Sequence, residues 1–339
     1  MFARVLFLCC VSAVSSLAAA TQECVDGKWI RQTDDGLPHI DCSRTPVAIR
    51  WSALTRERCS AYKRDEDWPV QDPYILRRAN WHGAATLMAH RLKHKRLWWV
   101  GDSITNLFWT GVNCELARHD MVPDGVNAAL RSAVDSIDPD VWESGPPFHV
   151  DHYTRTNTTL VSKGWHKVFR NEWQAMLPLA DIFLFNYGLH YNNQADFESD
   201  MDWLLNLLNE WPGTAIYREL NAQHFAKSSY DAALQGGDDG TFVCGANPAT
   251  VFENVVWKQN QFVRRQIEQK YKRIKILNFY NLTVPRSNLL EARFCQVEGR
   301  RSNPDAICLD CTHLTYTPQL YAKVVNDLYG LLAATKSAM

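Results

Sequence analysis

From residue 96 onward, short apolar runs alternate with longer amphipathic stretches. Short apolar runs are typical of strands buried in a parallel sheet, and apolar residues three or four positions apart are typical of helices. The pattern therefore predicts an α/β fold, a three-layer α/β/α sandwich with a mainly parallel sheet. The strands are expected at 97–100, 181–186, 214–220 and 274–280, and the helices at 104–118, 168–179, 196–210, 250–270 and about 317–335.

The first 95 residues follow a different pattern. Arg4 precedes an apolar run at 5–17, and alanines at 18–20 supply the small residues that signal peptidase needs, so residues 1–20 are interpreted as a signal peptide. The alternative is an uncleaved anchor, although the run is shorter than the ~20 residues of a spanning helix. Residues 21–95 show little periodicity, and we interpret them as an irregular, disulfide-stapled lead-in that packs on a main domain at 96–339.

Eight cysteines lie outside the signal segment, and an even number in a secretory chain is typical of disulfides. Their spacing leaves the pairing open. Two sequons make Asn157 and Asn281 candidate glycosylation sites, in agreement with a secretory-pathway protein of the Golgi lumen or the extracellular space. The candidate disulfide cysteines are Cys24, Cys42, Cys59, Cys114, Cys244, Cys295, Cys308 and Cys311.

The charge of the chain is nearly balanced, with 36 lysines and arginines against 37 aspartates and glutamates. This balance gives no reason to expect nucleic acid or an anionic membrane surface as a partner. A membrane contact is expected only if the signal segment is retained as an anchor. Neutral or weakly charged ligands fit the composition better.

Polar side chains follow three of the expected strands, at 101–103 (Gly-Asp-Ser), at 186–190 (Asn-Tyr-Gly-Leu-His) and at 219–224. In open parallel α/β sheets, ligands bind beyond the carboxyl ends of the strands. We therefore expect these three loops to form the functional site.

Ser103 is the candidate nucleophile, because a serine that opens a helix after a buried strand faces the first-turn amides and the positive end of the helix dipole. The alternative is that Ser103 only caps the helix. Asp310 and His313 are the candidate orienting carboxylate and base, since residues three apart on one helical turn lie on the same face. The alternative for this segment is a solvated turn followed by a helix.

Gly-Asp-Ser near the start of an α/β domain and Asp310-Cys311-Thr312-His313 near its end are hallmarks of the SGNH (GDSL-type) hydrolase superfamily, which this chain resembles. Finer features resemble the PC-esterase branch, which includes the plant trichome-birefringence-like polysaccharide O-acetyltransferases. These features lie at 95–100, 181–190, 218–219, 223–225 and 244, and the resemblance covers about residues 90 to 335. The chain departs from the plant pattern at 104–106, where Arg-Asn-Gln is absent, and at 314–315, where Leu-Thr replaces Trp-Cys.

The resemblance implies that Ser103 is the acyl-accepting nucleophile, His313 the base and Asp310 its partner. It also implies that Asn186 holds the oxyanion together with the backbone amide of Ser103. The alternative for Asn186 is a turn residue at a strand end. The glycine that serves as a further oxyanion donor in the family is left open here between Gly145 and Gly164.

Other polar residues at the strand ends are candidate substrate-binding residues, with a structural role in the loops as the alternative. No metal site is expected. His149 and His152 lie in a loop-like stretch without the helical glutamate of a zinc protease, and Cys308 and Cys311 lack a second cysteine pair. The candidate substrate-binding residues are Asp102, Gly188, His190, Arg218, Glu219 and His224.

Together these observations predict a secretory-pathway serine O-acyltransferase or esterase that acts on acyl esters of glycans, with acetyl esters expected first, through an acyl-serine intermediate. Its partner is a carbohydrate or polysaccharide substrate. No tightly bound cofactor is expected, and a transferase would use an acyl donor as co-substrate. The alternative is a catalytically inactive secreted glycan-binding protein with the same fold.

Overall fold

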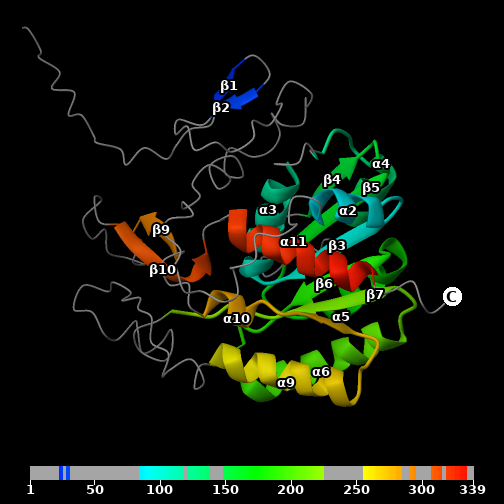
Figure 1. The fold of residues 1–339 in the computed structure, drawn as a ribbon. Coiled ribbons are helices and arrows are strands. Elements are labelled where there is room, and N and C mark those ends of the chain that lie inside the picture. The colour runs from blue at the N-terminus through cyan, green and yellow to red at the C-terminus, as the bar shows by residue number, and fades with distance from the viewer. Residues whose placement is uncertain are drawn as a thin grey trace, which may run out of the picture.

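A six-stranded sheet forms the centre of the part of the chain that the computed structural model describes (Figure 1). Its strands lie in the order β4-β5-β3-β6-β7-β8, and β4 is antiparallel to β5 while all other neighbours are parallel. The mainly parallel α/β fold is therefore confirmed. The strands are β3 (Arg96–Gly101), β4 (His149–Tyr153), β5 (Thr158–Gly164), β6 (Ile182–Asn186), β7 (Thr214–Arg218) and β8 (Lys275–Leu277).

The structure describes the main domain and a few separate segments. They are residues 23–25, 28–30, 84–117, 121, 123–137, 148–191, 193–224, 255–284, 290–294, 307–314 and 318–333.

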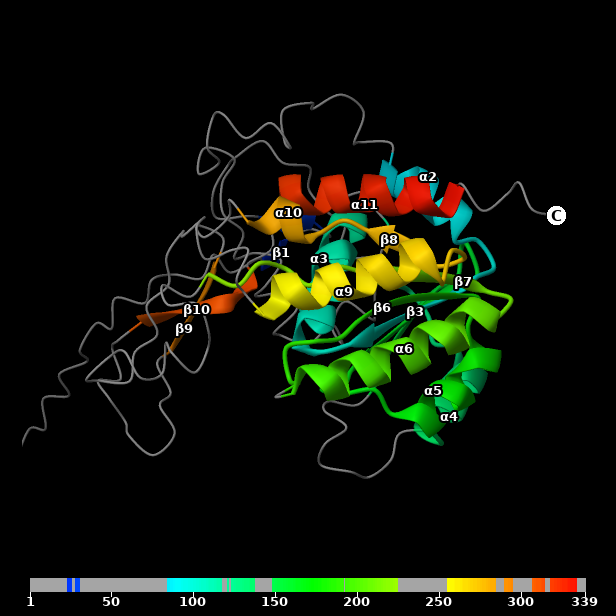
Figure 2. The ribbon, with the colours of Figure 1, turned by 90° about the horizontal axis from the view of Figure 1, so that it is seen from below.

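Three helices cover one face of the sheet: α2 (Ala84–Arg91), α3 (Ser103–Ala117) and α11 (Pro318–Ala333) (Figure 2). Side chains alternate along a strand, so Leu97 and Trp99 of β3 both point to this face, where they join a core with Phe108 and Val324. Met88 of α2 is fully buried in the same core. The core thus begins inside the segment that the sequence assigned to the lead-in.

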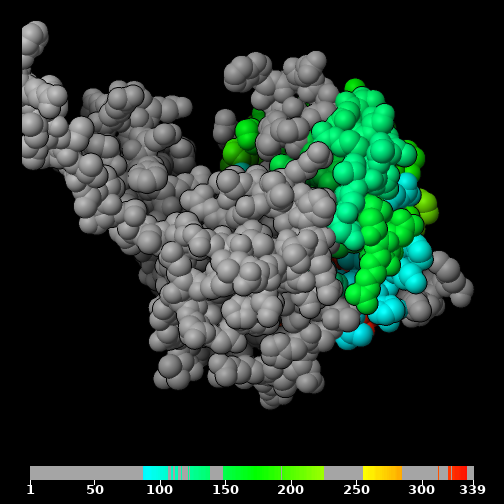
Figure 3. Space-filling model, turned by 90° about the horizontal axis from the view of Figure 1, so that it is seen from above, coloured from blue at the N-terminus to red at the C-terminus, as the bar shows by residue number. Residues whose placement is uncertain are grey.

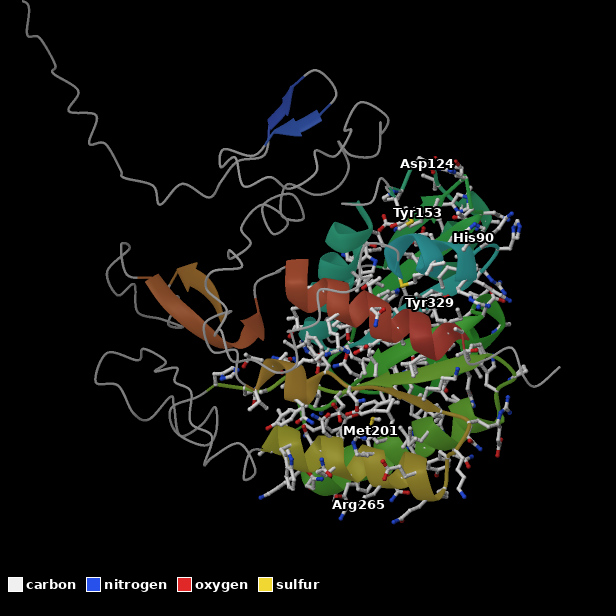
Figure 4. All side chains as sticks on the ribbon, in the orientation of Figure 1. His90, Asp124, Tyr153, Met201, Arg265 and Tyr329 are labelled. Atoms are coloured by element: carbon white, nitrogen blue, oxygen red, sulfur yellow. The ribbon has the colours of Figure 1, made fainter. Side chains whose placement is uncertain are left out.

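The opposite face is covered by α4 (Ala128–Asp135), α5 (Arg170–Met176), α6 (Gln194–Glu210) and α9 (Val255–Gln269), with a 3-10 turn at Leu177–Leu179. Trp98 and Val100, the alternate residues of β3, point into this layer. In Figure 4, Met201 lies between the sheet and helices α6 and α9, whereas Arg265 points outward from α9. The two helical layers confirm the three-layer sandwich.

Every strand that the sequence predicted is present, although the last is shorter than expected and is followed by α10 (Tyr280–Thr283). Two strands of the main sheet, β4 and β5, were not predicted. The loop-like interpretation of the stretch that holds His149 and His152 is wrong, because both residues lie in β4, an edge strand of the sheet. On the face seen in Figure 3, the green segment that carries α4 and β4 forms the surface beside α2.

Two small antiparallel pairs lie outside the main sheet. They are β1 (Glu23–Val25) with β2 (Lys28–Ile30), and β9 (Leu290–Phe294) with β10 (Ile307–Leu314). The pair of β9 and β10 lies apart from the main sheet, on the side of α10, in Figures 1 and 2. Among the described residues, no helix has the length and apolar character needed to cross a bilayer. The expected signal peptide at 1–20 lies outside the described residues.

Candidate functional site

The order of the strands brings two of the expected loops together. Along the chain β5 follows β3 and β6 follows β5, but in the sheet β3 lies between β5 and β6. This reversal is the topological switch point at which sheets of this kind bind ligands. Gly101 at the end of β3 pairs with Asn186 at the end of β6. The two loops that carry the candidate nucleophile and the candidate oxyanion donor are therefore neighbours.

Ser103 is the first residue of α3 and is half-buried. The cap of this helix is Asp102, whose Oδ1 accepts the backbone N–H of Ile104 at 3.1 Å and whose carbonyl accepts that of Thr105 at 2.9 Å. A carboxylate in this position satisfies a first-turn amide that would otherwise lack an acceptor. The capping function that was the alternative for Ser103 thus belongs to Asp102.

Asn186 is fully buried and bonds the turn at 101–105 from the side of β6. Its Nδ2 donates to Asp102 Oδ1 at 2.9 Å, and its Oδ1 accepts the hydroxyl hydrogen of Thr105. A side chain at Gly101 would not fit this arrangement, because a Cβ there would lie 2.1 Å from the Asn186 carbonyl oxygen. One Nδ2 hydrogen is engaged by Asp102, and the predicted oxyanion role would fall to the other.

The end of β5 also reaches the turn that begins at Gly101. Gly164, the last residue of β5, pairs with Gly101, and the backbone N–H of Trp165 donates to the Gly101 carbonyl at 2.5 Å. Of the two glycines left open as a further oxyanion donor, Gly164 is therefore next to the turn. Gly145 lies outside the described residues.

His190 stacks on His166, with ring centroids 4.1 Å apart and the planes 27° from parallel. His166 follows β5 and His190 follows β6, so the two rings join the loops on either side of β3. His166 could not be selected from the sequence, because β5 was not predicted. The substrate-binding role of His190 stays a prediction.

Gly188 lies under the loop that follows β7. A Cβ at this position would lie 2.4 Å from Cδ1 of Leu220 and 2.5 Å from Oε1 of Gln259. Its carbonyl accepts Nε2 of Gln259 at 3.0 Å. The close approach of α9 explains the need for glycine here, and its predicted substrate contact stays a prediction.

Arg218, at the end of β7, has no exposed surface. Its guanidinium lies over the rings of Phe108 and Phe279, at 5.0 Å and 5.3 Å from their centroids, and its Nη1 donates to the Glu219 carbonyl at 2.9 Å. Burial lowers the pKa of Arg218 to about 10, with the charge of Asp102 acting in the opposite direction, so the group is protonated at neutral pH. The structure gives Arg218 a place in the interior, and its substrate-binding role stays a prediction.

Glu219 is 3% exposed and joins three segments. One carboxylate oxygen accepts Nη2 of Arg264 at 2.5 Å, and the other accepts the backbone N–H groups of Phe279 and Tyr280 at 3.0 Å and 3.2 Å. Although partial burial opposes it, Glu219 raises the pKa of Arg264. The carboxylate thus ties β7 to α9 and to the start of α10.

His224 is also buried, and its Nε2 lies 3.0 Å from the carbonyl oxygen of Thr283. A carbonyl only accepts, so Nε2 carries the hydrogen and donates it. Burial lowers the pKa of His224, which keeps the ring neutral near pH 7. The contacts of Glu219 and His224 are structural in this state, and their substrate-binding roles stay predictions.

Asp310 and His313 lie in β10, so the helical-turn interpretation of this segment is wrong. Leu309 pairs with Ala292 and Leu314 with Leu290, which means that five positions along β10 correspond to two along β9. The intervening residues form an irregular bulge, a feature that commonly redirects side chains near active sites. The side chains of Asp310 and His313 lie outside the described residues, and the triad stays a prediction.

The backbone between Asp310 and His313 is nevertheless attached to the carboxyl edge of the sheet. Asn221, in the loop after β7, donates its Nδ2 to the Thr312 carbonyl at 2.6 Å, and Gln223 Nε2 donates to Thr312 Oγ1 at 3.1 Å. Strand β10 also contacts α3, the helix that begins with Ser103. The loop after β7 therefore joins β10 to the carboxyl edge of the sheet, and β10 also lies against α3.

Several other sequence-based expectations concern surface and covalent features. Asn157, in the turn between β4 and β5, and Asn281, in α10, are both exposed, and their glycosylation stays a prediction. The pairing of the cysteines lies outside the described side chains. Within the described ranges, no three His, Cys, Asp or Glu side chains gather as a metal site would require.

Comparison of the sequence with protein-family models and with curated proteins finds no match. Among solved structures, the chain is similar to LAE5, an alpha/beta hydrolase enzyme from the metagenome of Lake Arreo, Spain. The sequence identity is 13%, the match covers 72% of this chain and 97% of that chain, and the TM-score is 0.37. A likeness of this extent does not assign the chain to a family.

Proposed function

We propose that this protein is a secretory-pathway serine O-acyltransferase or esterase that acts on acyl esters of glycans through an acyl-Ser103 intermediate. The observation that carries the proposal is the position of Ser103 at the start of α3 and at the switch point of the sheet. A nucleophile there has first-turn amides and the helix dipole beside it, which stabilise negative charge. Asp102 supplies a capping bond at the start of this helix.

Acylation would proceed in two steps. The Ser103 hydroxyl oxygen attacks the ester carbonyl while the imidazole of His313 takes the hydroxyl proton, and Asp310 stabilises the imidazolium. The negative charge then on the carbonyl oxygen is held by the backbone amide of Ser103 and by Asn186, and each such donor contributes ~3 kcal/mol of transition-state stabilisation. Collapse of this intermediate expels the alcohol, which takes the proton from His313, and leaves the acyl group on Ser103.

Deacylation reverses the proton path with a second hydroxyl compound. His313 takes a proton from water in an esterase, or from a sugar hydroxyl in a transferase, and the oxygen of that group attacks the acyl carbonyl. The bond between the acyl group and Ser103 then breaks, His313 returns the proton to the serine oxygen, and the acid or the acylated sugar leaves. The two activities share one covalent intermediate and differ in how well the site excludes water and orients the acceptor. No tightly bound cofactor takes part, and a transferase would use an acyl donor as co-substrate.

The cellular setting belongs to the same proposal. The basic and apolar residues at 1–20, the eight later cysteines and the two exposed sequon asparagines support a protein of the Golgi lumen or the extracellular space. The resemblance to polysaccharide O-acetyltransferases supports a carbohydrate partner. A membrane contact is expected only if the segment 1–20 is retained.

The proposal is tested by brief exposure of the purified full chain to an activated acetyl ester, followed by mass analysis of its peptides. The expected result is an acetyl group on the peptide that contains Ser103. Ser103→Ala should remove this adduct and lower ester turnover by roughly 10⁴-fold or more. Ser136→Ala is the matched control, because Ser136 is exposed at the end of α4 and should change neither measurement.

The alternative function is a catalytically inactive glycan-binding protein with the same fold. In that case the wild-type chain would bind glycans but carry no acyl group after exposure to the ester, and Ser103→Ala would bind equally well. Retained turnover in Ser103→Ala would instead show that another residue is the nucleophile. For an active protein, adding a polysaccharide acceptor separates the two reactions, since a transferase yields acetylated sugar and an esterase yields acetate.

A further inference from the structure

The loop that follows β7 holds the bulge of β10 by two side-chain bonds. Asn221 is 1% exposed, and its Nδ2 donates to the carbonyl of Thr312 at 2.6 Å and to that of Ala222 at 3.1 Å. An amide nitrogen carries two hydrogens, so it can serve both carbonyls. Gln223 adds a bond from Nε2 to Thr312 Oγ1 at 3.1 Å. Thr312 is thus held through its backbone and through its side chain.

The loop itself is fixed on its other side. The backbone N–H of Ala222 donates to Thr283 Oγ1 at 2.8 Å, and His224 donates to the Thr283 carbonyl. The side chain of Asn260 accepts the N–H of Leu220 at 2.9 Å and donates to its carbonyl at 3.0 Å. These buried bonds to α10 and α9 make the loop a rigid support and not a mobile partner for Thr312.

The bond from Asn221 falls where the ladder between β10 and β9 is irregular. The register is regular from Ile307 to Leu309 and resumes only at Leu314. A bulge of this kind disrupts the ladder locally and redirects side chains. Asn221 donates to the carbonyl of Thr312, which lies between the two predicted triad residues in the sequence.

We propose that Asn221 is a positioning residue that sets the orientation of His313 relative to Ser103 by fixing the backbone of the β10 bulge; this inference rests on the function proposed above. Asn221 acts through Thr312 and does not itself touch the substrate. The carbonyl of Thr312 is part of the peptide bond that leads directly to His313. Movement of that peptide would displace the imidazole, and a displacement of about 1 Å in a catalytic geometry can cost ~10²-fold in rate.

The test compares Asn221→Ala with Asn113→Ala in the full-length protein. Asn113 is the matched control because it is an equally buried asparagine whose side chain bonds Asp151 and Tyr153 toward the β4 edge of the sheet. Hydrogen exchange of the 307–314 segment reports on the bulge without any reference to activity. We expect exchange there to be ~10-fold faster in Asn221→Ala and unchanged in Asn113→Ala.

The second readout is the acylation of Ser103 by an activated acetyl ester. For Asn221→Ala we expect kcat to fall by ~10²-fold while KM stays within about threefold, because the group that moves is the base and not a binding contact. Asn113→Ala should keep both constants. Gln223→Ala, which removes only the bond to Thr312 Oγ1, should show smaller changes of the same kind and serves if Asn221→Ala fails to fold.

The outcomes separate the positioning role from the proposed function. Unchanged exchange at 307–314 in Asn221→Ala, or faster exchange with unchanged kcat, would overturn the positioning role while leaving the enzyme intact. A higher KM with unchanged kcat would also overturn the positioning role, because it would assign Asn221 to substrate binding. If the wild-type chain itself never acylates at Ser103, the proposed function fails, and the positioning role fails with it.

Discussion

At the scale of single residues, Asp102 and Arg218 are oppositely charged residues whose charges interact at the carboxyl edge of the sheet. Both are fully buried, at the ends of β3 and β7. Oδ2 of Asp102 and both Nε and Nη2 of Arg218 have no hydrogen-bond partner among the described residues. A buried charge is tolerated when an opposite charge compensates it, and removing one partner leaves the other uncompensated.

We therefore expect Arg218→Met to lower the free energy of unfolding by ~3–5 kcal/mol, as measured in urea. Methionine fills the space over the two phenylalanine rings but leaves Asp102 without a counter-charge. The double variant Asp102→Asn, Arg218→Met should be less destabilised than the sum of the single variants, by ~1 kcal/mol or more. Strict additivity would contradict the electrostatic dependence and assign the loss to packing.

Strand-end position identified Asp102, Asn186, Arg218 and Glu219 from the sequence, but their partners could not be found in the same way. Asp102 and Asn186 are separated by 84 residues, and Glu219 and Arg264 by 45. Only the folded sheet makes such pairs neighbours. The sequence assigned Asn186 to an oxyanion and the other three side chains to a substrate, whereas the structure shows bonds within the protein for all four.

At the scale of elements, the apolar-run rule found the central strands and missed two at one edge. β5 contains Thr158, Thr159, Ser162 and Lys163, all buried although polar, and three of the five residues of β4 are polar or charged. Neither pattern is a continuous apolar run, so neither predicts a buried strand. Helix α9 did offer a sequence signal for buried polar contacts, because Gln259 and Asn260 are polar residues at buried positions of an otherwise amphipathic helix.

Strand β4 also carries a buried carboxylate. Asp151 is 9% exposed and accepts Nδ2 of Asn113 from α3 at 3.2 Å, while the hydroxyl of Tyr153, labelled in Figure 4, donates to Asn113 Oδ1. Burial raises the pKa of Asp151 from 3.8 to about 7, although the bond from Asn113 acts in the opposite direction. The native state therefore favours the protonated carboxyl.

This raised pKa makes the stability of the protein depend on pH through Asp151. The native state holds a proton that the unfolded chain loses near pH 3.8, so the contribution is fully present below about pH 4 and is lost as the pH rises to about 7. The two pKa values correspond to a loss of ~4 kcal/mol. Asp151→Asn keeps the shape and the acceptor but has no charge to bury.

We expect Asp151→Asn to raise the free energy of unfolding by a few kcal/mol at about pH 8, and by less than about half of that at pH 5. Urea unfolding of both proteins at the two pH values measures the difference. Asp135→Asn is a suitable control, because Asp135 is exposed at the end of α4. An equal gain for Asp151→Asn at both pH values would show that this carboxyl ionises alike in the two states.

At the scale of the whole molecule, the alternation of strands and helices predicted the layers but not the order of the strands. Right-handed crossovers allow β5 and β6 to lie on the same side of β3 or on opposite sides. The observed order puts β3 between them, which makes Gly101 a neighbour of both Gly164 and Asn186. The location of the candidate site thus depends on the order of the strands in the sheet, which the local sequence pattern does not determine.

The same order predicts where the molecule is most stable. β3 and β6 have a strand on each side and a helical layer on each face, whereas β8 is a three-residue edge strand whose Lys275 and Ile276 are only half-buried. Amides that open only on global unfolding exchange far more slowly than those released by local fraying. We therefore expect the backbone amides of β3 and β6 to exchange at least ~100-fold more slowly than those of β8 in the native protein, measured by hydrogen exchange with peptide-level mass analysis. If β8 proved as slow as β3, opening of this edge would be coupled to global unfolding, and the site at β3 and β6 would owe its rigidity to the sheet as a whole and not to its central position.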